Sequence, residues 1–254
     1  MYAFSFLCVV GALYFTLKKG DKISAIVAMV LIMISTAIYQ AYIGVYITMG
    51  LIYYICYLFK ANDIVQLLKY SVRTIGITCG GMLLYLISNK LVQNYYGVIA
   101  VDGRGFSTMG QLKLGETISN IGKSYVYFVQ YYFGDQLINN GVGHRKEINI
   151  LFFTVLVYLV ISAYVCLKKV WKKIAFVVFI MIIPIVEMII VIIAPEADIL
   201  DTTGILMLPT MVGTYILGIV LFNQMYVNNT IVKYVTIVVE ALVLYMCAII
   251  NISG

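Results

Sequence analysis

Long apolar runs, separated by short clusters of charged residues, make up most of this chain. A helix needs about 20 residues to cross the hydrocarbon core of a bilayer, and the runs have about that length. They predict membrane spans at about 1–17, 23–38, 41–59, 71–92, 148–167, 174–193, 205–225 and 231–250. We therefore expect an all-α, polytopic helical membrane protein, a single integral membrane domain (residues 1–254) with about eight transmembrane helices.

One apolar run, from Ile23 to Phe59, is too long for a single crossing and must contain a turn. The turn is predicted at Tyr39-Gln40, because Gln40 is the only strongly polar side chain in the run and an unpartnered amide is costly in lipid. Polar side chains in such positions of membrane proteins tend to be functional. A short interfacial hairpin without chemistry is the alternative interpretation.

Tyrosines recur at helical spacing along the span that follows this turn. They fall on one face of the expected helix, at Tyr39, Tyr42, Tyr46, Tyr53 and Tyr57. Such a stripe suits a polar cavity, because each hydroxyl needs a partner and each ring can stack on a sugar or an isoprenoid. Packing between helices explains the same pattern.

The longest segment between spans is an expected outer loop at 94–147. It begins with a glycine-rich stretch that includes Asp102-Gly103-Arg104-Gly105 and is typical of a turn. Apolar residues then repeat at helical spacing, with polar residues on the other faces. This pattern predicts an amphipathic helix at about 112–133, lying along the membrane surface.

An acidic residue lies inside the sixth expected span. Glu187 follows Pro184 by three residues, and the proline frees a backbone carbonyl and favours a kink toward the acid. An intramembrane acid is a candidate functional residue, although a structural glutamate with hydrogen-bond partners fits equally well.

The composition agrees with a helical membrane protein. Hydrophobic residues make up 63% of the 254 residues and charged residues 11%, and the mean hydropathy is +1.01. A membrane barrel would instead show segments of about 10 residues with alternating polarity. The net charge of +6 is not gathered into a basic face with aromatic readers, so we expect no nucleic-acid partner. The five cysteines lack metal-ligand spacing, and we expect no metal site.

The charges also predict the orientation. Connections at 18–22, 60–73, 168–173 and 226–233 hold eleven basic residues, Lys18, Lys19, Lys22, Lys60, Lys69, Arg73, Lys168, Lys169, Lys172, Lys173 and Lys233, against Asp21 and Asp63. The positive-inside rule places these connections in the cytoplasm. The Tyr39-Gln40 hairpin and the 94–147 loop then lie on the extracytoplasmic face. Met1 would also begin outside, which suggests a chain truncated at its N-terminus.

These features suit chemistry on a lipid-linked polar substrate. Glycosyl transfer from a polyprenyl phosphate needs a carboxylate to take a proton from the acceptor hydroxyl and a group that binds the leaving phosphate. Asp102 and Glu187 are the candidate catalytic acids. Arg104 is a candidate phosphate ligand, and Tyr39, Gln40 and Tyr42 are candidate substrate-binding residues. The chain has no Walker, Rossmann, zinc or nucleophile-elbow motif, and we expect no cofactor.

Two segments carry a family resemblance. The stretch STAIYQAYIGVYITMGLIYYI resembles the hallmark segment of the bacterial Gtr type II glucosyltransferases, which convert serotype, and LYLISNKLVQNYYG is similar in style. The resemblance implies a GT-C-type membrane enzyme that moves a glucosyl group from undecaprenyl phosphate to a cell-surface glycan. It implies a base in the first outer loop, which has no matching position here because that loop would precede Met1. The resemblance therefore leaves open whether this chain alone is active. Tyr39 and Gln40 are the positions of the family motif that can be carried over to this sequence.

Three other functions remain open. An O-antigen polymerase or ligase has similar spans but usually relies on several outer arginines, and only Arg104 and Arg145 lie outside here. A transporter or flippase would explain Glu187 and Glu240 through proton coupling. The sequence shows no evident internal repeat of the kind that many transporters have. A non-catalytic subunit of a surface-polysaccharide pathway is the third.

Overall fold

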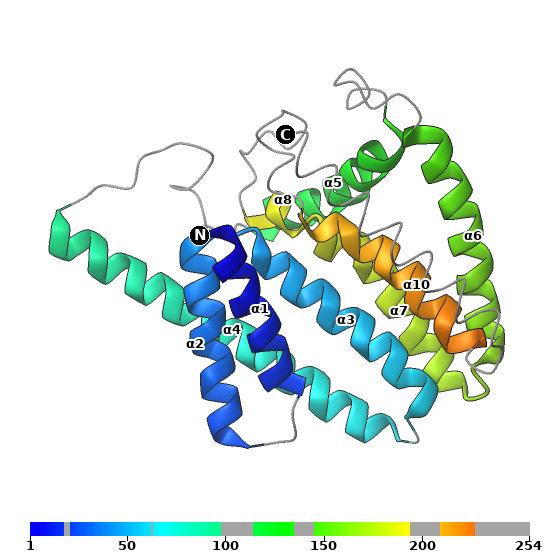
Figure 1. The fold of residues 1–254 in the computed structure, drawn as a ribbon, viewed down its shortest axis with the longest axis horizontal. Coiled ribbons are helices and arrows are strands. Elements are labelled where there is room, and N and C mark those ends of the chain that lie inside the picture. Colours follow the sequence, from blue (N-terminus) through cyan, green and yellow to red (C-terminus); the bar gives the residue numbers. More distant parts are fainter. Residues whose placement is uncertain (18–20, 62, 98–113, 135–144, 194–208, 227–254) are drawn as a thin grey trace.

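The computed structural model describes residues 1–17, 21–61, 63–97, 114–134, 145–193 and 209–226 (Figure 1). All regular structure in these ranges is helical, as expected from the apolar runs. The elements are α1 (Tyr2–Leu17), α2 (Lys22–Ile38), α3 (Tyr42–Lys60), α4 (Ile64–Tyr96), α5 (Leu114–Phe133), α6 (Arg145–Cys166), α7 (Val170–Glu187), α8 (Ile189–Ile193), η2 (Pro209–Met211) and α10 (Val212–Tyr226).

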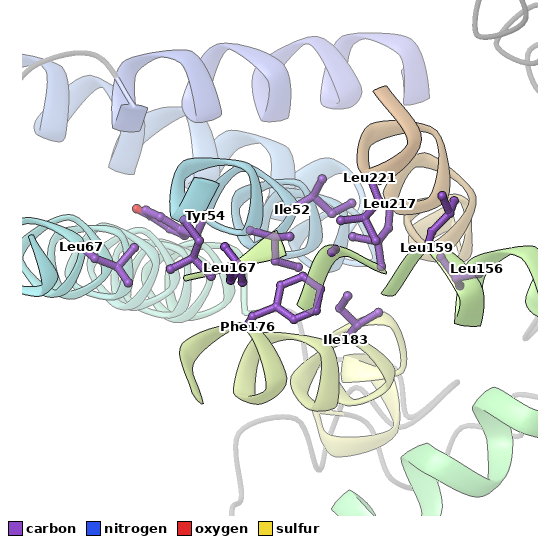
Figure 2. Close-up of a cluster of buried hydrophobic side chains, with 13 residues drawn as sticks. Ile52, Tyr54, Leu67, Leu156, Leu159, Leu167, Phe176, Ile183, Leu217 and Leu221 are labelled. Atoms are coloured by element: carbon purple, nitrogen blue, oxygen red, sulfur yellow. The ribbon is translucent and has the colours of Figure 1, made fainter. Parts of the chain in front are cut away.

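Helix α3 lies between two groups of helices (Figure 1). On one side it packs with α1, α2 and α4, where buried side chains such as Val9, Ala28, Ile32 and Tyr46 form one core. On the other side it packs against α7 and α10, and α10 packs against α6. Figure 2 shows the second core, in which Ile52 of α3 meets Leu217 and Leu221 of α10.

Helix α4 is much longer than the predicted span at 71–92. It has 33 residues, about 50 Å at 1.5 Å per residue. Asp63 caps its start by accepting a hydrogen bond from the backbone N–H of Val65 at 3.0 Å, and Gly97 ends it with a left-handed φ of 65°. Helix α4 therefore extends past both ends of the span predicted at 71–92, and Lys69 and Arg73 of the predicted connection lie on it.

Three described helices are long and apolar enough to cross a membrane, α3, α4 and the Lys146–Cys166 part of α6. Three more are apolar but shorter: Tyr2–Leu17, Lys22–Ile38 and Val212–Met225. The described structure thus gives fewer spans than the eight predicted, and the predicted span at 231–250 lies outside the described residues. Side chains on α4 and α6 are mostly exposed, whereas α3 is mostly buried, so α3 is the central helix.

The expected sixth span is broken near its end. Helix α7 ends at Glu187, Met188 leaves the helical conformation, and the short helix α8 follows. The backbone N–H of Met188 donates to the Pro184 carbonyl at 3.1 Å, which closes the last turn of α7. The break follows Pro184 by four residues, inside the range predicted for the sixth span, where the proline predicted a kink toward Glu187.

Helix α5 occupies the range predicted for the amphipathic helix. Part of its apolar face packs on the protein, since Tyr132 and Phe128 lie in a core with Met188, Val191 and residues of α6. At the other end of the helix Ile118 remains 69% exposed. The second half of the apolar face is therefore covered by protein, and the place of this helix along a membrane surface stays a prediction.

Candidate active site

The predicted turn at Tyr39-Gln40 is present and is tight. Helix α2 ends at Ile38, and the Tyr39 backbone N–H donates to the Ser35 carbonyl at 2.8 Å. The next N–H groups, of Tyr42 and Ile43, donate to the carbonyls of Tyr39 and Gln40 at 3.2 Å. Residues 39–41 therefore reverse the chain without a longer loop, and they hold their side chains close to the start of α1.

Aromatic rings gather around this turn. The Tyr39 ring makes edge-to-face contacts with the rings of Tyr2 and Tyr42, both with centroids 5.0 Å apart, and Phe6 lies 5.9 Å from Tyr42. Tyr2 and Phe6 are exposed, while Tyr39 is also partly exposed. The cluster thus offers an accessible aromatic surface, of the kind on which a sugar or an isoprenoid chain can stack.

The Gln40 amide is held by a residue that the sequence analysis missed. Its Nε2 donates to the hydroxyl of Tyr85 at 2.5 Å, and Tyr85 is a buried residue of α4. Helix α4 comes close because Gly81 has no side chain: a Cβ there would lie 2.7 Å from Cγ2 of Ile32 on α2. Tyr85 lies in the LYLISNK stretch, but no local pattern shows its pairing with a residue 45 positions away.

Packing explains part of the tyrosine stripe on α3. Tyr46 is completely buried, and its hydroxyl bonds with Oγ1 of Thr16 on α1 at 2.8 Å. Tyr53 and Tyr57 stack on each other, and Tyr57 also contacts Tyr70 of α4. The accessible tyrosines of the stripe are therefore Tyr53, which is 41% exposed, and the partly exposed Tyr57, Tyr39 and Tyr42, of which the last two lie near the turn.

Glu187 lies at the centre of a second polar group, where α7 breaks. The side chain is 1% exposed, and the hydroxyl of Thr214 lies 2.9 Å from both carboxylate oxygens. The Tyr132 hydroxyl lies 3.4 Å from Oε2 and donates a shorter bond, 2.6 Å, to the Met211 carbonyl. Thr210 donates to the backbone carbonyl of Glu187 at 2.6 Å. Burial and the nearby carboxylate raise the pKa of Tyr132 well above its usual range, so its hydroxyl keeps its proton.

A second layer of polar contacts joins this group to α6. Asn149 donates from Nδ2 to the Tyr132 carbonyl at 2.8 Å and accepts from the Tyr215 hydroxyl at 2.6 Å. Within the described parts of the chain, the carboxylate of Glu187 thus bonds to hydroxyl groups rather than to a cation. The arrangement connects α5, α6, α7 and α10 at one point.

Glycines let α3 approach this group. A Cβ on Gly213 would lie 2.3 Å from Cγ2 of Thr48 and 2.8 Å from Oε1 of Glu187, and one on Gly44 would lie 2.4 Å from Cγ2 of Thr210. Gly44 follows Tyr42 by two residues. The turn and the Glu187 group are therefore linked through the first turn of α3, although Gln40 and Glu187 bond to different partners.

The remaining candidates, Asp102 and Arg104, lie outside the described residues. Among the residues that are described, no group of three or more histidine, cysteine or acidic side chains is arranged to hold a metal ion. The side chains brought together are thus aromatic rings and an amide at the turn, and a buried acid with hydroxyl partners at the break in α7.

The described residues form a helical protein with three helices long and apolar enough to cross a membrane, and the family comparison specifies the kind of protein. Residues 1–222 match the family model described as glucosyl transferase GtrII. The chain therefore belongs to the GtrII glucosyl transferase family, which confirms the predicted resemblance. The match includes the turn, Tyr85, α5 and the Glu187 group. Searches of curated proteins and of solved structures found no match.

Proposed function

We propose that this protein is a membrane glucosyltransferase of the bacterial cytoplasmic membrane. It transfers a glucosyl group from a polyprenyl phosphate to a cell-surface glycan on the extracytoplasmic face. The observation that carries the proposal is the family match over residues 1–222, which supports glucosyl transfer. A polyprenyl phosphate is the donor class that suits a protein whose accessible surface is largely apolar.

The exposed side chains support the placement in a membrane. Leucine, isoleucine and valine side chains are exposed along α1, α4 and α6, for example Leu7, Leu83 and Leu151. An apolar surface of this extent is stable in contact with lipid and costly in water. Arg73 donates to the Asp21 carbonyl at 3.4 Å, so the start of α2 lies beside the third turn of α4, and both carry basic residues. The turn at Tyr39-Gln40 is at the opposite end of α2, which agrees with an extracytoplasmic site.

The turn supplies the binding groups in this proposal. The rings of Tyr39 and Tyr42 stack on the sugar or on the first isoprene units. The Gln40 amide donates from its nitrogen to Tyr85, and its carbonyl oxygen accepts a hydrogen bond from a sugar hydroxyl. Arg104 pairs with the donor phosphate, as a guanidinium forms two parallel hydrogen bonds with such a group.

The chemistry is a displacement at the anomeric carbon of glucose. A carboxylate, Asp102 or Glu187, takes the proton of the acceptor hydroxyl while the acceptor oxygen bonds to C1. The bond between C1 and the phosphate oxygen breaks, and polyprenyl phosphate leaves with the electron pair. Because Glu187 is enclosed by Thr214 and Tyr132, it reaches substrate only after the α7–α8 junction opens.

Substitutions in the chromosomal gene test the proposal in living cells. Gln40→Ala should lower glucosylation of the surface glycan while membrane content of the protein is unchanged, and Asp102→Asn should lower it further. Lys123→Gln, an exposed change on α5, is the matched control. Unchanged glucosylation in both Gln40→Ala and Asp102→Asn would refute the proposed site.

One observation favours a second function, transport of a lipid-linked sugar. Broken helices with a buried acid at the break occur in secondary transporters, and α7 and α8 have this form at Glu187. A flippase would move a polyprenyl-phosphate sugar across vesicles of the purified protein without forming a new glycosidic bond. Product analysis of one reconstituted sample therefore separates the two functions.

A further inference from the structure

The turn between α6 and α7 carries a dense basic cluster at the opposite end of the molecule from Tyr39-Gln40. Lys168 and Lys169 are exposed in the turn, and Lys172 and Lys173 follow in the first turn of α7. The proposed glucosyl transfer does not use these residues. We call the four lysines, together with Trp171, the α7 basic cluster.

The start of α7 has positive partial charge, and among the described residues no side chain caps it. Lys169 is the N-cap residue and makes no side-chain capping bond, and the N–H groups of Lys172 and Lys173 both bond back to the Lys169 carbonyl. The preceding N–H groups, of Val170 and Trp171, have no acceptor within the helix. Free N–H groups and the helix dipole together favour an anion at this position.

Lys172 adds a cation that is held in place at this turn. The residue is 9% exposed, and its amine lies over the ring of Trp171. Burial and the charge of the neighbouring Lys169 lower the pKa of Lys172. An anion placed beside the turn would oppose this shift, because it favours the charged form of the lysine.

Aromatic residues fix the cluster at the edge of the apolar surface. Trp171 packs on the core shared with Leu58 and Leu167, and the amines of Lys172 and Lys173 lie 5.8 Å and 4.8 Å from the ring centres of Trp171 and Tyr164. Exposed apolar side chains, Val165, Val170 and Ile174, border the same turn. Tryptophan and tyrosine beside lysines, with apolar residues next to them, are typical of the headgroup level of a bilayer.

From these observations we infer that the α7 basic cluster binds the phosphate of an anionic phospholipid in the cytoplasmic leaflet. The free N–H groups and Lys172 contact the phosphate, the exposed lysines face the headgroup layer, and the acyl chains lie against Val170 and Ile174. A lipid rather than a soluble phosphate is the ligand because the site adjoins exposed apolar side chains. The inference depends on the proposed membrane placement and not on glucosyl transfer.

Trp171 is the only tryptophan of the chain, and so its fluorescence reports on this site alone. The full chain would be reconstituted in mixed phosphatidylglycerol and phosphatidylcholine vesicles, with bromine on the acyl chains of one lipid or of the other. Bromine quenches tryptophan on contact. Brominated phosphatidylglycerol should quench Trp171 more strongly than brominated phosphatidylcholine at the same mole fraction. We call the ratio of the two quenching constants the preference, and we expect it to be about five-fold or more.

Variants assign the preference to the cluster. Lys172→Gln should reduce it about five-fold, since a lysine near an anionic surface contributes about 1 kcal/mol. Lys172→Arg should retain it, and Lys123→Gln on α5 is the control. A Lys172→Gln protein that fails to fold would be replaced by the exposed pair Lys168→Gln and Lys169→Gln, which should also lower the preference.

Three results would overturn the inference. Equal quenching by the two brominated lipids would show that no anionic headgroup is selected, and a preference unchanged in the lysine variants would place it elsewhere. Loss of the preference on adding inorganic phosphate at constant ionic strength would indicate a soluble anion instead. Absence of quenching by either lipid would overturn the site together with the membrane placement, while glucosylation in cells would still test the proposed function separately.

Discussion

Replacing Gly213 by alanine should destabilise the protein, because this glycine lets α10 contact α3 and the Glu187 group. An added methyl carbon would lie 2.3 Å from Cγ2 of Thr48 and 2.8 Å from Oε1 of Glu187. Carbon atoms in favourable contact are about 3.5–4.0 Å apart, so the helices must separate or Thr48 must move.

The expected magnitude follows from two opposing effects. Inserting a methyl group into a packed site costs about 1–3 kcal/mol, and alanine in place of a helical glycine returns up to about 1 kcal/mol. The net loss should be about 1–2 kcal/mol. For a chain of this size that corresponds to a fall of about 2–8 °C in the unfolding temperature.

Thermal unfolding of the purified protein in detergent measures the effect, and a second glycine is the matched control. Gly76 lies within α4, and a Cβ there would meet nothing within 4 Å. Gly76→Ala should therefore leave the unfolding temperature unchanged or raise it. A Gly213→Ala protein as stable as Gly76→Ala would refute the close packing of α3 and α10.

A second substitution tests which atom makes the clash. Thr48→Ala removes Cγ2, and within the described residues the buried Thr48 hydroxyl has no hydrogen-bond partner to lose. Combined with Gly213→Ala, it should restore a large part of the lost stability, a non-additive result expected for residues in contact. Simple addition of the two losses would contradict the geometry.

Three further predictions concern the polar groups. Tyr85→Phe removes the partner of the Gln40 amide and should lower glucosylation in cells, with no further loss when Gln40→Ala is added; additive losses would argue against the coupling. Thr214→Val leaves the buried Glu187 short of a hydrogen bond and should lower the free energy of unfolding by about 1–3 kcal/mol, measured by thermal unfolding, whereas an unchanged value would count against the network. Because the pKa of Tyr132 is raised in the folded protein, its hydroxyl contributes to the free energy of unfolding below about pH 10, where the unfolded side chain titrates, and this contribution is lost as the pH rises further. Tyr132→Phe should therefore weaken the loss of stability at alkaline pH. The same dependence of stability on pH in both proteins would contradict this.

The features predicted from sequence are those that depend on neighbouring residues. Apolar runs indicated helices, the polar Gln40 indicated the turn in an overlong run, and the repeat after Leu114 indicated α5. Each of these signals is local, because a helix places residues three and four apart on one face.

The features that could not be predicted depend on contacts between distant residues. Lys69 and Arg73 looked like a loop because they are charged, but they lie on a helix that continues for several turns. The pairing of Gln40 with Tyr85, and of Glu187 with Thr214, joins residues far apart in the chain. No spacing within a single segment reports such pairs. The break after Glu187 had a local signal, because Pro184 predicted a kink toward that acid.

Transfer of glucose from a purified donor tests the central claim most directly. The purified protein would be mixed with radiolabelled polyprenyl-phosphate glucose and its acceptor glycan, without any nucleotide sugar. The account predicts label in the glycan, release of polyprenyl phosphate, and a reduced rate for Gln40→Ala. Label that reaches the glycan only when a nucleotide sugar is supplied would contradict the proposed donor and with it the proposed function.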